Sequence, residues 1–367
     1  MNAVRTTLPG RDYWSEEVYE LDREKVFFRE WFVVARADEA PAPGDYVTVD
    51  VAGESLIVIR GADGELRAFH NVCRHRGARI CDPESTGRAK RALKCPYHAW
   101  SYAPDGRLIG TPLVARTELD RSQLGLWPVA LATWQGFVFV HLGEPEETLL
   151  EALERQTDRP RQYERWHMEE LRTAHRTVAE VAANWKILIE NYNECLHCPT
   201  VHPELVQVAP TFGKGLVIEE GRDEGDWGVS IAGGGVALTR TGTSELPVIP
   251  GLDDHDARSI YGACLFPNMF IDLTGTAVIA ARLQPRGPAH TTIVTDYLFR
   301  PEVVEDPAFD PSDVVEFSEL VAKQDYVVCE RVQLGVRSRA FDHGVYAEKD
   351  ALPYAFNQTY LAARDGS

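Results

Sequence analysis

The chain of 367 residues lacks long apolar runs and has a deficit of positive charge. No window reaches the ~18 consecutive apolar residues of a membrane-spanning helix. The N-terminus also lacks the apolar core of a signal peptide, so we expect a cytoplasmic protein that does not enter membranes. Lys and Arg number 38 against 56 Asp and Glu, and the net charge of −18 argues against nucleic acid or an anionic membrane as partner.

Cysteine is scarce as well, with seven in the whole chain. An odd number in a long chain without a secretion signal is not typical of a disulfide framework. We therefore expect these cysteines to be ligands or buried thiols. The sequence has no internal repeat and no low-complexity tract, and its 44% hydrophobic content is that of an ordinary globular protein.

Short strands and longer helices alternate along the chain, which predicts an α+β fold. Val/Ile-rich runs between Gly/Asp turns are typical of antiparallel strands, and caps such as Ser15 mark helix starts. The predicted elements are a helix over 15–34, short strands over 38–143, helical segments over 147–165, a long helix over 183–197, strands over 261–300 and a long helix from Ser312.

The stretch "CRHRGARICDPESTGRAKRALKCPYH", residues 73–98, contains two Cys/His pairs. They are Cys73-x-His75 and Cys95-x-x-His98. Paired cysteine and histidine could hold zinc. However, Cys-x-His followed by Cys-x-x-His on two hairpin tips is the Rieske arrangement, in which two cysteines hold one iron of a [2Fe–2S] cluster and two histidines the other. Strand-like sequence on both sides favours the cluster over zinc.

A second group of ligand-type residues lies in "ENYNECLHCPTVH", residues 190–202. They are Glu190, Glu194, Cys195, His197, Cys198 and His202. Taken alone they could be a zinc site, an iron site or ordinary packing. On a helix, both glutamates and His197 share one face. A loop returning past Pro199 can bring His202 beside His197. Two imidazoles and one carboxylate from elsewhere would then form the 2-His-1-carboxylate triad of non-haem Fe(II) oxygenases.

The third ligand is expected in the C-terminal helix, "SDVVEFSELVAKQDYVVCERVQLGVRSRAF", residues 312–341. Asp325 sits in its middle among valines, and an acid in an apolar stretch needs a partner. The acids nearer the helix start are expected there because of the helix dipole. Spacing alone leaves Asp325 and Glu330 both open. Cys195 and Cys198 are interpreted as packing residues, since thiolates would crowd the open face of the iron.

Three motifs in order carry a family resemblance: "CRHRG…CPYHAW", "NYNECLHC-x₃-H" and "QDYVVCERVQ-x-G". Over nearly its whole length the chain resembles the α-subunits of Rieske non-haem iron oxygenases. Within that group it is similar to the glycine betaine and carnitine monooxygenases, which act on quaternary ammonium compounds. The resemblance implies an antiparallel β Rieske domain over 37–145 and a helix-grip catalytic domain over 146–367. Residues 1–36 would be an N-terminal helical segment of the catalytic domain.

The resemblance also implies roles for particular residues. It assigns Cys73, His75, Cys95 and His98 to the [2Fe–2S] cluster. It assigns His197, His202 and Asp325 to the mononuclear Fe(II), and an electron-bridging role to Glu194. Leu196 departs from the tyrosine often found there in the betaine enzymes, which affects the expected substrate.

The implied activity is that of an oxygenase component, with O₂-dependent N-demethylation or hydroxylation of a small quaternary ammonium compound such as a betaine. A homotrimer is implied, with electrons from NAD(P)H passed by a separate flavin/iron–sulfur reductase or a ferredoxin. A ring hydroxylase or a tailoring oxygenase for an aromatic or secondary-metabolite substrate is one alternative. An electron-transfer iron–sulfur protein is another, against which the second set of iron ligands argues.

Two surfaces follow from these expectations. Seven basic residues lie from Arg74 to Lys94 against only Asp82 and Glu84, which predicts a docking site for an acidic redox partner. They are Arg74, Arg76, Arg79, Arg88, Lys90, Arg91 and Lys94. A cationic substrate would favour an aromatic cage. The candidate aromatic residues are Tyr192, Phe212, Trp227, Tyr261, Phe266 and Phe270.

Overall fold

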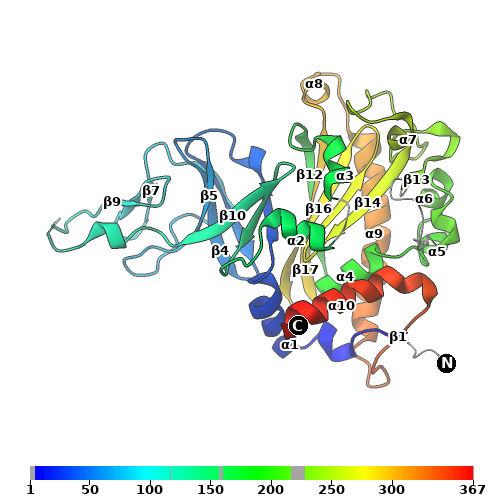
Figure 1. Ribbon diagram of the computed structural model, residues 1–367, viewed down its shortest axis with the longest axis horizontal. Helices are drawn as coiled ribbons and strands as arrows, with labels where there is room; N and C mark the ends of the chain where they lie inside the picture. Colours follow the sequence, from blue (N-terminus) through cyan, green and yellow to red (C-terminus); the bar gives the residue numbers. More distant parts are fainter. Residues whose placement is uncertain (1–4, 116, 157–159, 216–227, 367) are drawn as a thin grey trace. The chain divides into compact units, whose positions relative to one another are not determined.

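The computed structural model describes residues 5–115, 117–156, 160–215 and 228–366 (Figure 1). Trp227 therefore lies outside the described residues. Contacts divide the chain into two compact units, a β unit formed by Phe27–Gln156 and a larger unit formed by Met1–Val26 with Thr157–Ser367. These divisions fall at 26/27 and 156/157, whereas the sequence placed them at 36/37 and 145/146. No described helix is both long and apolar enough to cross a membrane.

The β unit contains one seven-stranded antiparallel sheet and one small three-stranded sheet. The large sheet has the order β2-β11-β10-β5-β4-β3-β6, and the small one β7-β8-β9. The large-sheet strands are β2 (Phe32–Arg36), β3 (Asp45–Val51), β4 (Glu54–Arg60), β5 (Leu66–His70), β6 (Thr86–Arg88), β10 (Pro128–Trp134) and β11 (Phe137–His141). The small-sheet strands are β7 (Leu93–Lys94), β8 (Ser101–Tyr102) and β9 (Leu108–Gly110). The short strands expected over 38–143 are thus confirmed.

The N-terminal helix is shorter than predicted. Helix α1 covers Glu16–Asp22, and one π-helical stretch continues it to Phe27. Residues 32–36 instead form strand β2, which pairs with β11. The prediction of a helix to residue 34 was wrong there, because the aromatic and β-branched run "WFVVAR" satisfies its backbone hydrogen bonds in the sheet. Ser15 is the N-cap residue, but its side chain makes no capping hydrogen bond.

The larger unit is built on a six-stranded antiparallel sheet with the order β12-β17-β16-β15-β14-β13. Its strands are β12 (Arg172–Val181), β13 (Val229–Ser230), β14 (Ser259–Leu265), β15 (Met269–Leu273), β16 (Val278–Gly287) and β17 (His290–Phe299). The strands expected over 261–300 are confirmed. Strand β12 was not predicted, because its many polar and charged side chains weaken the apolar signal of a strand.

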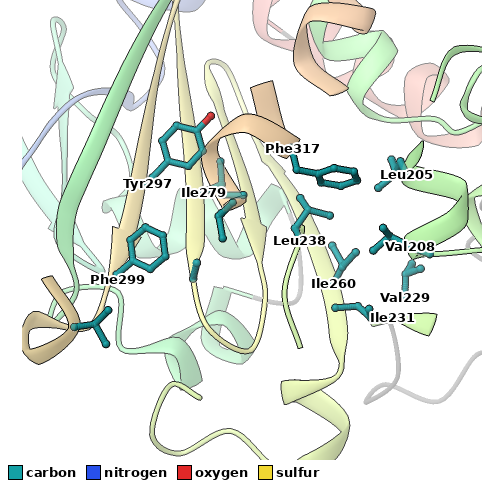
Figure 2. Packing of buried hydrophobic residues seen from close by; sticks show 14 residues of the cluster. Leu205, Val208, Val229, Ile231, Leu238, Ile260, Ile279, Tyr297, Phe299 and Phe317 are labelled. Atoms are coloured by element: carbon teal, nitrogen blue, oxygen red, sulfur yellow. The ribbon is translucent and has the colours of Figure 1, made fainter. Parts of the chain in front are cut away.

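The expected long helix from Ser312 is α9 (Ser312–Gly335), which runs along this sheet (Figure 1). Val314 and Phe317 on α9 are buried against Ile279 and Tyr297 of the sheet. Leucine and valine side chains of α6 (Pro203–Val208) complete the same cluster (Figure 2). Burial of such side chains contributes about 1.5–3 kcal/mol each, so this packing fixes α9 on the sheet.

Helix α4 (Trp185–Tyr192) is held by a buried ion pair. The ammonium of Lys186 pairs with the carboxylate of Asp22, and both side chains are fully buried. Asp22 also accepts hydrogen bonds from Trp185 Nε1 at 3.0 Å and from the Tyr360 hydroxyl at 2.7 Å. Tyr360 belongs to α10 (Ala351–Asp365). Because removing one partner of such a pair is strongly destabilising, this network fixes the start of α4, the helix that leads to the site.

Candidate metal centres

Two loops of the β unit have the same backbone geometry. The N–H of Cys73 donates to the carbonyl of Ala78, and the N–H of Gly77 donates back to Cys73. The second loop, between β7 and β8, repeats both bonds at the same spacing, from Cys95 to Trp100 and from Ala99 to Cys95. Gly77 and Ala99 occupy equivalent places and both have positive φ, +72° and +57°. Each loop therefore presents its Cys and His from a matching turn.

The side chains of these loops are arranged in two layers. The thiols of Cys73 and Cys95 are buried, and burial raises the pKa of Cys95, whose thiol also contacts Cys73. The imidazoles of His75 and His98 are exposed, with ring centroids 4.7 Å apart. The four residues predicted as cluster ligands are thus brought together. Two adjacent thiols inside and two adjacent imidazoles outside fit a [2Fe–2S] cluster with mixed ligation.

Neighbouring side chains hold this arrangement in place. The Tyr102 hydroxyl lies 3.3 Å from the Cys73 sulfur and accepts the Arg74 N–H at 3.0 Å. The ring of Trp100 stacks on His75 with an interplanar angle of 7°. Cys81 is buried in the core of the β unit, where burial raises its pKa to about 11. That environment agrees with its interpretation as a buried thiol.

In the larger unit, α4 ends at Tyr192, five residues before the end predicted for the helix over 183–197. Glu194 and His197 therefore do not lie on one helical face. The carboxylate of Glu194 accepts the backbone N–H of Leu196 and the Nδ1–H of His197, the latter at 2.6 Å. Local bonds of this kind compete with helical hydrogen bonds, which explains the early end. A short helix, α5 (Cys198–Val201), then leads to His202.

His197, His202 and Asp325 converge from this segment and from the middle of α9. Asp325 Oδ1 lies 3.2 Å from His197 Nε2 and 2.9 Å from His202 Nε2. Their ligand-type atoms all lie within 4.8 Å of one another. The remaining ring nitrogens are engaged, since His202 Nδ1 donates to Gln324 Oε1 at 2.8 Å, as His197 Nδ1 does to Glu194. Both Nε2 atoms are thereby directed toward the Asp325 carboxylate.

The electrostatics of this group indicate that it needs a cation. Burial alone would lower the pKa of His197, but contacts with Asp325, Cys198 and Glu194 raise it to about 12. Burial would raise the pKa of Asp325, yet hydrogen bonds from His197 and His202 hold it below its usual value. A bound metal ion would supply the positive charge that a proton on imidazole otherwise provides. Two imidazoles and one carboxylate fit a mononuclear iron.

The other ligand candidates lie elsewhere. The carboxylate of Glu330 accepts the Ala182 N–H at 3.1 Å, away from the histidines. Glu190 accepts the Tyr13 hydroxyl at 2.7 Å. Cys195 and Cys198 are not part of the group of converging atoms, although the Cys198 sulfur lies 4.0 Å from His197 Nε2. Gln324 was missed by the sequence reasoning, although it directly precedes Asp325 and offers an amide oxygen to a ligand histidine.

A cavity of about 300 Å³ adjoins the three converging residues and reaches across the sheet. Its aromatic lining comprises Tyr163, Tyr192, Phe212, Tyr261, Phe270, Tyr297 and Tyr326, and its acidic lining Glu194, Asp272, Glu319 and Asp325. Among the described residues that line it there is no Lys or Arg. Four of the six aromatic cage candidates are present, whereas Phe266 instead packs against Trp185. Asp272 was not predicted, although an acid in the apolar strand "MFIDL" was a visible signal.

A β unit with paired Cys/His loops, joined to a helix-covered sheet with a 2-His-1-carboxylate group, is the architecture of Rieske-type iron oxygenases. Residues 30–132 match the Rieske [2Fe-2S] domain model. Residues 168–365 match the ring hydroxylating alpha subunit (catalytic domain) model, and the chain belongs to that family. It is therefore an oxidoreductase whose cofactors are a [2Fe–2S] cluster and a mononuclear iron. A pure electron carrier is thereby excluded.

Several proteins that are similar to this chain are named as monooxygenases. The glycine betaine monooxygenase oxygenase subunit of Chromohalobacter salexigens is 30% identical over 368 residues, 93% of this chain and 82% of that protein. The carnitine monooxygenase oxygenase subunit of Escherichia coli K12 is 38% identical over 209 residues, about half of each chain. The crystal structure of the quaternary ammonium Rieske monooxygenase CntA with L-carnitine has a TM-score of 0.76, at 25% identity over 98% of this chain and 96% of that one. The chain is thus the oxygenase subunit of a multi-component system that receives electrons from a reductase.

Replacing Asp325 tests the metal group. In Asp325→Ala we expect iron content to fall from about three to about two per chain, with an unchanged visible spectrum of the cluster, because only the carboxylate between the histidines is lost. Glu330→Ala, on the same helix, is the matched control and should keep all of its iron. Iron analysis beside the visible spectrum measures both. If Glu330→Ala loses the iron and Asp325→Ala keeps it, the ligand has been misassigned.

Proposed function

We propose that the chain hydroxylates an N-methyl group of a small quaternary ammonium compound in an O₂-dependent reaction that ends in N-demethylation. The observation that carries this proposal is the aromatic and acidic lining of the cavity beside His197, His202 and Asp325. Aromatic faces attract cations electrostatically, and the attraction is stronger where water is excluded. The names of the similar proteins support the same substrate class. The cavity volume suits a small ligand.

In this proposal His197, His202 and Asp325 hold the iron at the end of the cavity. When bound, the iron supplies activation of O₂, and the cluster, held by Cys73, Cys95, His75 and His98, supplies a stored electron. One oxygen atom enters a C–H bond, and the other leaves as water after uptake of two electrons and two protons. The product is an N-hydroxymethylammonium ion, which loses its hydroxyl proton as the C–N bond breaks, so that formaldehyde and a tertiary amine are released. The chain contributes orientation, exclusion of water and fixed imidazole tautomers.

We assign to Glu194 the coupling of the two centres, across a subunit boundary of a homotrimer. Its carboxylate already accepts from His197 Nδ1, and a carboxylate has lone pairs for a further donor. The cluster-type histidines His75 and His98 are exposed, so an N–H of a neighbouring subunit's histidine is accessible to such an acceptor. A solved structure of a similar quaternary ammonium Rieske monooxygenase is described in terms of inter-subunit electron transfer, which supports this assignment.

We place the docking site for the reductase or ferredoxin on the basic loop residues between Arg74 and Lys94. Arg74 lies over the ring of Trp127 and Arg88 pairs with Asp45 at 2.8 Å, so these two have internal roles. Lys90, Arg91 and Lys94 are exposed and close to the cluster loops in sequence. Positive charge there would steer an acidic partner to the outside of the cluster loops.

A substrate panel tests the proposed reaction. With a matched reductase, NAD(P)H and O₂, we expect formaldehyde release from quaternary methylammonium compounds, and none from neutral aromatic compounds. Formaldehyde and O₂ consumption are measured together, with Asp325→Ala as the inactive control. Hydroxylation of the aromatic compounds in place of formaldehyde release would favour the ring-hydroxylase alternative and overturn the proposal.

The bridging role predicts a specific defect in Glu194→Gln. This variant should keep both metal centres and its oligomeric state but reoxidise a pre-reduced cluster at least about tenfold more slowly when substrate and O₂ are added, because an amide offers only one acceptor oxygen. Single-turnover spectroscopy of the fully metallated sample measures the rate. Glu316→Gln, at an exposed position of α9, is the comparison variant and should reoxidise at the wild-type rate. Reoxidation of Glu194→Gln at the wild-type rate would rule out the bridge.

Reversing charge on the basic loop tests docking. In Lys90→Glu/Arg91→Glu/Lys94→Glu, cluster reduction by the native partner should slow about tenfold or more at low salt and lose most of its salt dependence. The same three-charge reversal at the exposed residues Arg331, Arg337 and Arg339 should change it less. Stopped-flow reduction at several ionic strengths measures this. Equal rates for both variants would mean that the loop charges are only solvated.

A further inference from the structure

Asp272 is an acid placed on the cavity side of the sheet. It lies on β15 two residues after Phe270, so the two side chains share one face of the strand. Both line the cavity. In register, Asp272 pairs with Gly262 on β14 and with Ile279 on β16. A glycine beside the carboxyl leaves space that the hydroxyl of Tyr192 fills, since a Cβ at Gly262 would lie 3.2 Å from that oxygen.

Among the described residues, the side chain that hydrogen-bonds to this carboxyl is neutral. The Tyr192 hydroxyl donates to Asp272 Oδ1 at 2.8 Å. The other acids of the cavity lining have charged or ligand partners: Glu319 pairs with Lys323 at 2.5 Å, Glu194 with His197, and Asp325 with both histidines. Burial raises the pKa of Asp272 to about 6, and the nearby charge of Asp325 raises it too. When Asp272 is ionised, its carboxylate therefore lacks a positively charged partner among the described residues.

An aromatic surface lies directly beside this carboxyl. The rings of Tyr192 and Phe270 are stacked, with centroids 4.2 Å apart and an interplanar angle of 5°. Phe270 in turn has small neighbours in register, Cys264 and Ala281, and all three residues line the cavity. A carboxylate next to aromatic faces is a strong site for an organic cation, because it adds a full charge to the ring quadrupoles.

We propose that Asp272, with the stacked rings of Tyr192 and Phe270, holds the cationic nitrogen of the substrate, and that this substrate carries no carboxylate of its own. This inference rests on the proposed function. A zwitterion such as a betaine would bring its carboxylate into a cavity that already holds four acids and, among its described lining residues, no Lys or Arg. An unpaired buried carboxylate is expensive. A cationic alcohol or a simple alkylammonium ion has no such group. Asp272 thus selects for net positive charge.

The test measures binding to the fully metallated protein by calorimetry. The ligands are choline, glycine betaine and 3,3-dimethylbutan-1-ol, the neutral carbon analogue of choline. Wild type should bind choline about tenfold or more tightly than either of the others, because it alone is a net cation. Asp272→Asn should weaken choline binding by about tenfold or more and leave the neutral alcohol unchanged. Asp313→Asn, at the exposed start of α9, is the matched control and should bind as wild type does.

The outcomes separate the two levels of the argument. Unchanged choline binding in Asp272→Asn, or an equal loss for the neutral alcohol, overturns the role of Asp272. Tighter wild-type binding of glycine betaine than of choline overturns the absence of a substrate carboxylate while leaving the proposed function intact. If wild type neither binds nor demethylates any quaternary ammonium compound, the proposed function itself fails. The wild-type comparison needs no variant, so it decides the matter even where Asp272→Asn does not fold.

Discussion

Negative charge gathered inside the larger unit is the constraint around which its structure is organised. Asp325, Glu194 and Asp272 line one cavity whose described lining contains no Lys or Arg. Carboxylates in such a place cost free energy unless a cation is supplied. At the histidine end the raised pKa of His197 shows the demand for positive charge, which a metal ion would satisfy. At the sheet end Asp272 has a tyrosine hydroxyl, and we propose that a substrate cation completes that site.

The elements around this cavity are held by packing and by a buried ion pair. The buried pair of Asp22 and Lys186 fixes α4, while Val314 and Phe317 fix α9 on the sheet. The apolar cluster of α9 shares Ile279 and Tyr297 with the cavity lining, so the same packing positions α9 and forms part of the cavity wall. The sheet side is formed by alternate residues of antiparallel strands, and small ones such as Gly262 leave room for polar ones. The packing of these helices and strands offsets the free-energy cost of holding several carboxylates close together.

The sequence predicted the parts of the site that depend on local geometry. The cluster loops are closed by hydrogen bonds within six residues, so Cys73-x-His75 and Cys95-x-x-His98 could be recognised directly. The choice between Asp325 and Glu330 depends on tertiary packing, since both lie on α9. The structure shows that Glu330 accepts a hydrogen bond from the backbone N–H of Ala182. The end of α4 at Tyr192 depends on a carboxylate competing for backbone N–H groups. Asp272 was not predicted, because alternation along a strand does not tell whether its face meets a core or a cavity, which is a tertiary property.

The cluster loops are rich in positive charge and the cavity lining is rich in negative charge, and this difference favours different partners at the two places. Around the cluster loops seven basic residues stand against two acids, within a chain whose net charge is −18. The cavity lining, by contrast, has acids and aromatic rings. An acidic redox protein is attracted to the first and repelled by the rest of the chain, whereas a small organic cation is attracted to the chain as a whole and gains most in the cavity. Screening acts over about 8–10 Å in physiological salt, so each field is strongest close to the residues that produce it. The sign of the local charge therefore distinguishes an acidic electron donor from a cationic substrate.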